Sequence, residues 1–278
     1  MHKVKFISTK KEEIVILDTV TSRIIKHCIP TNKGYLEIEL RKTIYIINSL
    51  KFFFNFFKFF IKIKKIKLAT LLSLLVTKKT KIIISFSDNN QLINEIGQYA
   101  KDVKTILIQN GFRSNGKIHG WSSIKKFPIV YGFGFYEHDL IKDMKIPLQE
   151  YNPTGSLKYG IFQRKYAKLN HNKYENKDIS FISQYREIIE SDYEYKEVVK
   201  NIKITIPYLQ KNYKNFRIIL NEDEDSNILK KETKFYDEIN LNNQKNIFLR
   251  KSHYLDSYHF CNNSNILITY TSTLGFEF

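Results

Sequence analysis

The chain has 278 residues, 42% of them hydrophobic, and a formal net charge of +17 at pH 7. This length and apolar content suffice for a sizeable core, and we expect two domains of ordinary size. The positive charge comes from 38 lysines and only 7 arginines, and no zinc-finger, RNA-recognition or basic-zipper signature is present. Because proteins that recognise phosphates and bases rely on arginine, the sequence argues against a nucleic-acid partner.

The cysteines and the N-terminus indicate the compartment. Cys28 and Cys261 are the only cysteines, and neither belongs to a Cys-x-x-Cys pair, which argues against a disulfide scaffold or a structural zinc site. The first residues, MHKVKFISTKKEEIV, contain no apolar core of signal-peptide length. We therefore expect a cytoplasmic protein.

Residues 49–76, SLKFFFNFFKFFIKIKKIKLATLLSLLV, form the most apolar part of the chain. Lysines interrupt this segment, so no window reaches the roughly 20 apolar residues that a transmembrane helix needs. Two interpretations remain open. The segment is either a core-packed helix with a solvated lysine face, or an amphipathic helix that lies on the inner face of an anionic membrane.

In the first half of the chain, apolar runs at 81–86, 103–109 and 127–135 predict buried strands, and residues 90–100 predict a helix. Strands separated by segments of helical length indicate parallel pairing, with helices on both faces of the sheet. The first 48 residues are rich in strand-forming residues, but their pattern does not fix a topology.

The second half repeats this alternation of strand and helix. Strands are predicted at 178–184, 216–220, 246–250 and 265–272, and helices at 194–213, 227–240 and 254–261. Four such strands in about 100 residues indicate a doubly wound sheet. The turn-rich residues 151–177 between the halves predict a linker, with a domain boundary at residue 170. The predicted fold is α/β, with two Rossmann-like domains facing across a cleft.

Polar clusters follow the predicted strands at the end where such folds bind ligands. They are SDNN (87–90), QNGFRSN (109–115), YGFGFYEHD (131–139), SQYRE (183–187) and TSTLGFE (271–277). The glycines of GFGFYE do not match the GxGxxG pattern of dinucleotide-binding folds, so hydride transfer is not expected.

An ordered set of motifs resembles a known group of proteins. FSDNN, LIQNGFR, YGFGFYEHDLI, PTGSL, ISFISQYRE and TSTLGFE, from about residue 80 to the end, resemble bacterial surface-carbohydrate biosynthesis proteins of capsule and O-antigen. These are GT-B-like glycosyltransferases, and the motifs are distantly similar to the glycerophosphotransferases of teichoic-acid synthesis. The resemblance covers about two thirds of the chain.

The resemblance implies an N-terminal acceptor-side domain (1–170) and a C-terminal nucleotide-donor domain (171–278). It also implies a glycosyltransferase that moves a sugar from a nucleotide donor to a glycan or lipid-linked acceptor, without a metal or other cofactor. The acidic run NEDED (221–225) is the one candidate for binding a metal, and it fits a solvated loop better. A CMP-activated acidic sugar is one candidate donor, because of the basic residues near the predicted crevice.

The final motif, TSTLGFE, predicts a phosphate site of the donor. It follows a strand and leads toward a helix N-terminus, where backbone amides favour an anion. Hydroxyl donors are added by Thr271, Ser272 and Thr273, and Gly275 allows close approach of the backbone. The resemblance implies that Glu277 accepts hydrogen bonds from the ribose hydroxyls of the donor. The alternative is an ordinary capped helix.

Three residues are candidates for proton transfer or for support of an oxocarbenium-like centre, namely Asp88, Glu137 and His138. Asp88 follows a predicted strand, and the other two follow YGFGFY. A helix cap or an ion pair is the alternative for each carboxylate, and a structural role is the alternative for the histidine.

Other polar residues of these motifs are candidates for binding. Arg113 and Arg186 are scarce arginines beside predicted strand ends, and they suit a phosphate or a carboxylate. Ser183 joins them on the donor side. The acceptor-side candidates are Asn89, Asn110 and Asp139, of which the asparagines can equally be turn residues.

Two further expectations complete the sequence-based interpretation. Since the resembling proteins continue past STLGFE with a helix and more strands, we expect the C-terminal domain to be incomplete and poorly soluble or frayed. The alternative functions are a non-catalytic assembly protein at the membrane periphery and a glycerophosphotransferase-like polymer synthase.

Overall fold

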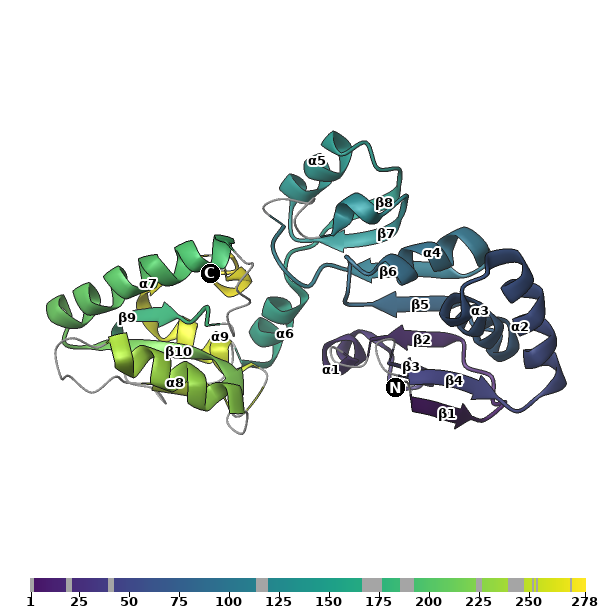
Figure 1. Cartoon of the computed structure of the whole chain (residues 1–278), viewed down its shortest axis with the longest axis horizontal. Coiled ribbons are helices and arrows are strands. Elements are labelled where there is room, and N and C mark those ends of the chain that lie inside the picture. The colour runs from purple at the N-terminus through teal and green to yellow at the C-terminus, as the bar shows by residue number, and fades with distance from the viewer. Residues whose placement is uncertain are drawn as a thin grey trace. The chain divides into compact units, whose positions relative to one another are not determined.

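The computed structural model describes residues 3–18, 22–39, 43–113, 120–166, 177–185, 193–223, 227–239, 248–251, 253, 255–270 and 272–278. Contacts divide the chain into two compact units, Met1–Ile161 and Phe162–Phe278, each with its own hydrophobic core (Figure 1). Both units are α/β, and every strand pair described is parallel. The predicted class of two Rossmann-like domains is confirmed. The boundary predicted at residue 170 lies outside the described residues.

The first unit contains a six-stranded sheet in the order β3-β2-β5-β6-β7-β8. Its strands are β2 (Ile14–Leu17), β3 (Tyr35–Ile38), β5 (Ile82–Ser85), β6 (Lys104–Ile108), β7 (Phe127–Gly132) and β8 (Leu148–Pro153). Ile84 pairs with Ile16 on one side and with Ile106 on the other, so β-branched side chains fill the centre of the sheet. β1 (Lys3–Ile7) and β4 (Thr43–Ile47) form a separate parallel pair.

Helices connect β2 to β3, β4 to β5, β5 to β6 and β7 to β8, and a last helix follows β8. They are α1 (Ser22–Ile25), α2 (Leu50–Ile63), α3 (Ile66–Lys78), α4 (Gln91–Tyr99), α5 (Phe135–Asp143) and α6 (Leu157–Tyr166), with 3₁₀ turns η2 (Lys26–Cys28) and η3 (Trp121–Ser123). Asn90 caps α4, since its side-chain oxygen accepts a hydrogen bond from the Leu92 amide at 3.0 Å. The division between the two units falls within α6.

The lysine-rich segment 49–76 forms two helices rather than one. Ser49 caps α2 by accepting a hydrogen bond from the Phe52 amide at 3.2 Å, and Lys64 ends the helix in a left-handed conformation (φ 57°). α3 then buries Leu68, Leu72 and most of its other side chains, so it matches the core-packed interpretation. Among the residues that the structure describes, no helix is both long and apolar enough to cross a membrane.

The second unit is built on a four-stranded sheet in the order β11-β10-β9-β12. Its elements are β9 (Lys177–Ile182), α7 (Tyr193–Asn212), β10 (Phe216–Asp223), α8 (Asn227–Ile239), β11 (Phe248–Lys251), α9 (Asp256–Asn262), β12 (Ser264–Ile268) and α10 (Thr273–Phe276). Side chains alternate along each strand, so Phe181 and Ile218 face α7 and α8, whereas Ile182 and Ile219 pack with residues of α9 and α10. Helices therefore cover both faces of the sheet.

Two expectations about local structure need correction. The strand predicted over 127–135 ends at Gly132, and Phe135 already belongs to α5. The linker predicted over 151–177 was wrong where the structure describes it, because these residues include the end of β8 and the whole of α6. A single helical turn, α10, lies within the motif STLGFE itself.

Candidate functional site

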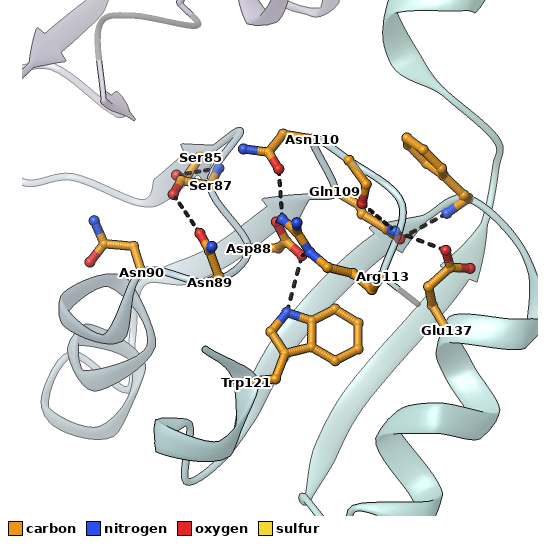
Figure 2. A network of polar contacts seen from close by, with 12 residues as sticks. Ser85, Ser87, Asp88, Asn89, Asn90, Gln109, Asn110, Arg113, Trp121 and Glu137 are labelled. Atoms are coloured by element: carbon orange, nitrogen blue, oxygen red, sulfur yellow. Dashed lines mark hydrogen bonds and ion pairs between the residues drawn. The ribbon is translucent and has the colours of Figure 1, made fainter. Parts of the chain in front are cut away.

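Polar side chains converge at the carboxyl ends of β5, β6 and β7 in the first unit (Figure 2). Because these three strands are parallel neighbours, the residues that follow each of them meet at one edge of the sheet. Asp88 comes from the turn after β5, Arg113 from the loop after β6 and Glu137 from the first turn of α5. The structure thus brings together three residues that the sequence separates by up to 49 positions.

Asp88 and Arg113 form a buried bidentate ion pair at the centre of this edge. Arg113 Nε lies 2.9 Å from Asp88 Oδ2, and Arg113 Nη2 lies 2.5 Å from Asp88 Oδ1. The Trp121 indole N–H donates to Oδ2 at 3.2 Å, and Nη2 also donates to Asn110 Oδ1 at 2.7 Å. Asp88 is 0% exposed and Arg113 is 7% exposed. Asp88 is therefore the counter-ion of Arg113, and both of its oxygens already accept hydrogen bonds within the network.

Within the part of the chain that the structure describes, one oxygen of the Glu137 carboxylate accepts a hydrogen bond. Gln109 Nε2 donates to Glu137 Oε1 at 3.0 Å and to the Gly111 carbonyl at 2.8 Å, while Gln109 Oε1 accepts from the Phe133 amide at 3.0 Å. Glu137 is 2% exposed. Among the described residues, no donor contacts its second oxygen, Oε2. The Gln109 amide thus orients a nearly buried carboxylate and leaves one oxygen for another partner.

His138 packs against the ring of Tyr151. Its ring centroid lies 5.0 Å from that of Tyr151, and its Nδ1 lies 3.8 Å from an oxygen of the exposed Asp139, too far for a hydrogen bond. The Tyr151 hydroxyl donates to the Gly134 carbonyl at 2.8 Å. Burial, assisted by the charge of Glu137, raises the pKa of Tyr151 above its usual range, so this hydroxyl stays protonated as a donor. The packing favours the structural role for His138.

The two asparagines predicted on the acceptor side, Asn89 and Asn110, differ in their surroundings. Asn110 accepts a hydrogen bond from Arg113 and so belongs to the buried network. Asn89 is exposed and accepts only a long hydrogen bond, 3.4 Å, from the Ser87 hydroxyl. Of these candidates, Asn89 and Asp139 are thus the two on the surface.

Two members of the network carry no clear signal in the sequence. Gln109 lies within the polar cluster QNGFRSN, but nothing in its neighbours indicates that it would bind Glu137, 28 residues away. Trp121 lies outside every polar cluster, and its only signal is that it is the single tryptophan of the chain. Such long-range pairs follow from the sheet, not from local sequence.

In the second unit, Ser183 is buried within a network of its own. Its hydroxyl donates to Glu232 Oε1 and accepts from the Tyr236 hydroxyl at 3.0 Å and the Tyr185 amide at 3.2 Å. Glu232 Oε1 also accepts from the Asn221 amide at 2.8 Å. Burial raises the pKa of Tyr236 above its usual range, which keeps it a donor. A phosphate could reach the Ser183 hydroxyl only by displacing one of these partners.

The C-terminal turn is described from Ser272 onward, and two of the predicted donor residues, Arg186 and Thr271, lie outside the described residues. Ser272 is the residue before α10, yet its hydroxyl makes no capping hydrogen bond, and its amide donates to Thr269 Oγ1 at 3.2 Å. Thr273 begins α10 and is half-buried. The Tyr258 hydroxyl donates to Glu277 Oε2, so this carboxylate already has a partner in its own unit.

Packing explains why residue 275 is a glycine, and the sequence did not reveal this reason. A Cβ built at this position would lie 2.2 Å from Thr269 Cγ2, far inside van der Waals contact. Its lack of a side chain is therefore explained by the close approach of Thr269.

Replacing Gly275 by alanine is expected to destabilise the second unit by about 1–3 kcal/mol, because the new methyl group overlaps the methyl group of Thr269. Thr269→Ser removes that methyl group, so the double variant should recover most of the loss in a urea unfolding titration. Equal stability of Gly275→Ala and the unaltered chain would show that the turn rearranges freely.

No group of three or more histidine, cysteine or acidic side chains that could hold a metal ion occurs within the described parts of the chain. The last two residues of the acidic run 221–225 lie outside those parts.

Comparisons with known proteins give little beyond the fold. A scan against protein-family models finds no match, and neither does a search of curated proteins. Among solved structures, the crystal structure of UDP-GlcNAc 2-epimerase from Neisseria meningitidis bound to UDP-GlcNAc is similar over 95% of this chain and 77% of that chain. The sequence identity is 13% and the TM-score is 0.45. A similarity of this degree carries no argument about substrate or activity.

Proposed function

We propose that this chain binds a nucleotide sugar and transfers the sugar to a glycan or lipid-linked acceptor, with Glu137 as the catalytic carboxylate. The observation that carries the proposal is the state of Glu137 itself. It lies at the carboxyl edge of a parallel sheet, with one oxygen fixed by Gln109 and the other without a donor among the described residues. The ordered sequence motifs that resemble surface-carbohydrate glycosyltransferases supply the substrate class.

The reaction assigned to this site is a displacement at the anomeric carbon. Glu137 Oε2 accepts the proton of the acceptor hydroxyl, whose oxygen forms a bond to that carbon. The bond from this carbon to the donor phosphate breaks, and the nucleotide leaves with the bonding electrons. Gln109 holds the carboxylate in one orientation, so little reorganisation is needed when the proton moves.

In this proposal, Asp88 and Arg113 position the loops and do not take part in the chemistry. Their charges neutralise one another, and Arg113 donates to both Asp88 and Asn110. The pair therefore fixes the turn after β5 relative to the loop after β6. Its effect on transfer is indirect, through the shape of the site.

We assign the donor to the second unit because of the C-terminal turn and the sequence motifs. The Ser272 hydroxyl, at the start of α10, makes no capping hydrogen bond. The sequence motifs alone support the proposal that the donor phosphate contacts Thr271, Thr273 and Arg186. Ser183 and Glu277 would have to exchange internal hydrogen bonds for ligand contacts.

The proposal is tested by calorimetric titration of the chain with CMP, UDP, GDP and CDP, followed by transfer assays with the sugar form of the nucleotide that binds. Glu137→Gln should retain nucleotide binding and lose about 10²–10⁴-fold in transfer rate, the range for a general base. Glu150→Gln, an exposed carboxylate on β8, is the matched control and should transfer normally. Binding of no nucleotide would exclude the proposal.

The same experiment separates the alternatives. A glycerophosphotransferase would require CDP-glycerol and release CMP, because it breaks the bond between the two phosphates of the donor. A non-catalytic assembly protein would bind no nucleotide at all.

A further inference from the structure

Helix α2 exposes a continuous apolar stripe on the surface of the first unit. Its members recur at intervals of three and four residues, so they share one face of a helix with about 3.6 residues per turn. They are Leu50, Phe53, Phe54, Phe57 and Ile61, which we call the outward stripe. Leu50 is 92% exposed, Ile61 74%, Phe54 72% and Phe57 59%. Large apolar side chains gathered in this way mark an interaction surface.

The stripe belongs to a helix that is already held in place. Phe52 is buried in the core of the first unit, and Phe59 and Ile63 pack against that core from the same side of α2. Figure 1 shows α2 beside α3 at the outer side of the first unit, and the two helices are in contact. The outward stripe is therefore not an unfinished part of the core, because a different face of α2 fills that role.

A row of lysines flanks the outward stripe. Lys51, Lys58 and Lys62, which we call the lysine row, are exposed and lie about 100° around the helix axis from the stripe. The sequence contains no aspartate or glutamate between Glu39 and Asp88. The surface of α2 thus combines exposed phenylalanines with a row of exposed, positively charged lysines.

We propose that α2 lies in the plane of an anionic lipid bilayer, with the outward stripe inserted at the level of the headgroups and the lysine row on the lipid phosphates. Apolar insertion and electrostatic attraction add in such a helix. A second copy of the chain fits less well, since pairing two stripes would bring two lysine rows together in a protein of net charge +17. This inference is independent of the proposed sugar transfer.

Sedimentation with lipid vesicles tests the proposal. The chain should bind vesicles that contain phosphatidylglycerol and bind pure phosphatidylcholine vesicles far less. Phe54→Ser/Phe57→Ser should reduce partitioning at least about tenfold, because both side chains lose their apolar surface. Lys51→Gln/Lys58→Gln/Lys62→Gln should reduce it about fivefold per lysine on anionic vesicles, and the effect should fade at high salt.

The matched control is Ile204→Ser/Tyr208→Ser, which removes an exposed apolar pair from α7 and should bind vesicles normally. Since all the altered residues are exposed, each variant should unfold at the temperature of the unaltered chain.

A fluorescent variant tests the depth of insertion. Because Trp121 is buried and is the only tryptophan, Phe57→Trp adds one reporter on the outward stripe. Its emission should shift to the blue on anionic vesicles and be quenched by brominated acyl chains. The proposal is overturned if the unaltered chain does not bind anionic vesicles, or if the stripe variant binds as well as the control. It is also overturned if the stripe mediates a dimer in sedimentation velocity and the tryptophan remains unquenched.

Discussion

Replacing Asp88 by alanine is expected to destabilise the first unit by about 3–5 kcal/mol, the cost of leaving a buried charge without its partner. The buried Arg113 side chain would lose both hydrogen bonds to the carboxylate. Trp121 would lose the acceptor of its indole N–H in the same step. A urea titration that follows the fluorescence of Trp121 measures the loss directly.

A double-mutant cycle separates the ion pair from other effects of the substitution. Asp88→Ala/Arg113→Ala should cost less than the sum of the two single changes, because the double variant leaves no unpaired charge. The control is Glu13→Ala, which breaks the exposed ion pair between Glu13 and Lys81 and should change stability little. If Asp88→Ala were no more harmful than Glu13→Ala, the pair would not be buried as the structure has it.

Replacing Glu232 by alanine is the second change with a large expected effect, about 2–5 kcal/mol in the second unit. The carboxylate is fully buried and accepts hydrogen bonds from the Ser183 hydroxyl and the Asn221 amide. Each donor left unsatisfied costs about 1–3 kcal/mol. Glu232→Gln keeps an acceptor oxygen at this position and should lose less.

Hydrogen exchange and a surface control complete this test. The amide of Asn221 should exchange faster in Glu232→Ala than in the unaltered chain, since its acceptor has gone. Glu238→Ala, on the same helix but exposed, should change neither stability nor exchange by a measurable amount. Unchanged protection of Asn221 in Glu232→Ala would show that this network contributes little to the unit.

The strands from β5 onward were largely predictable for local reasons, whereas the pattern of the first 48 residues, which contain β1 to β4, fixed no topology. Runs such as Ile82–Ser85 and Lys104–Ile108 are short, rich in β-branched residues and separated by segments of helical length. β8 was missed because it is an edge strand that exposes Gln149 and Glu150 and ends at Pro153, so it resembles a turn-rich linker. The break between α2 and α3 was also missed, because a lysine in the left-handed conformation leaves no signal in the sequence.

The candidate site was predictable as a location but not as a set of contacts. Strand ends of a parallel sheet gather at one edge, and this rule alone predicts that Asp88, Arg113 and Glu137 lie near one another. Which carboxylate pairs with the arginine depends on loop conformation, and the sequence left both roles open for Asp88. The packing requirement for glycine at position 275 could not be predicted either, because Thr269 approaches Gly275 only in the folded chain.

The hydrogen bond from Tyr151 to Gly134 gives the edge strand β8 a structural role. Edge strands such as β8 usually tolerate change, since they have a neighbour on one side only. Here a shift of β8 by one residue would turn Tyr151 to the opposite face of the sheet and leave the backbone before α5 without its donor. β8 therefore helps to fix the start of α5, the helix that carries Glu137, although it has a neighbour on one side only.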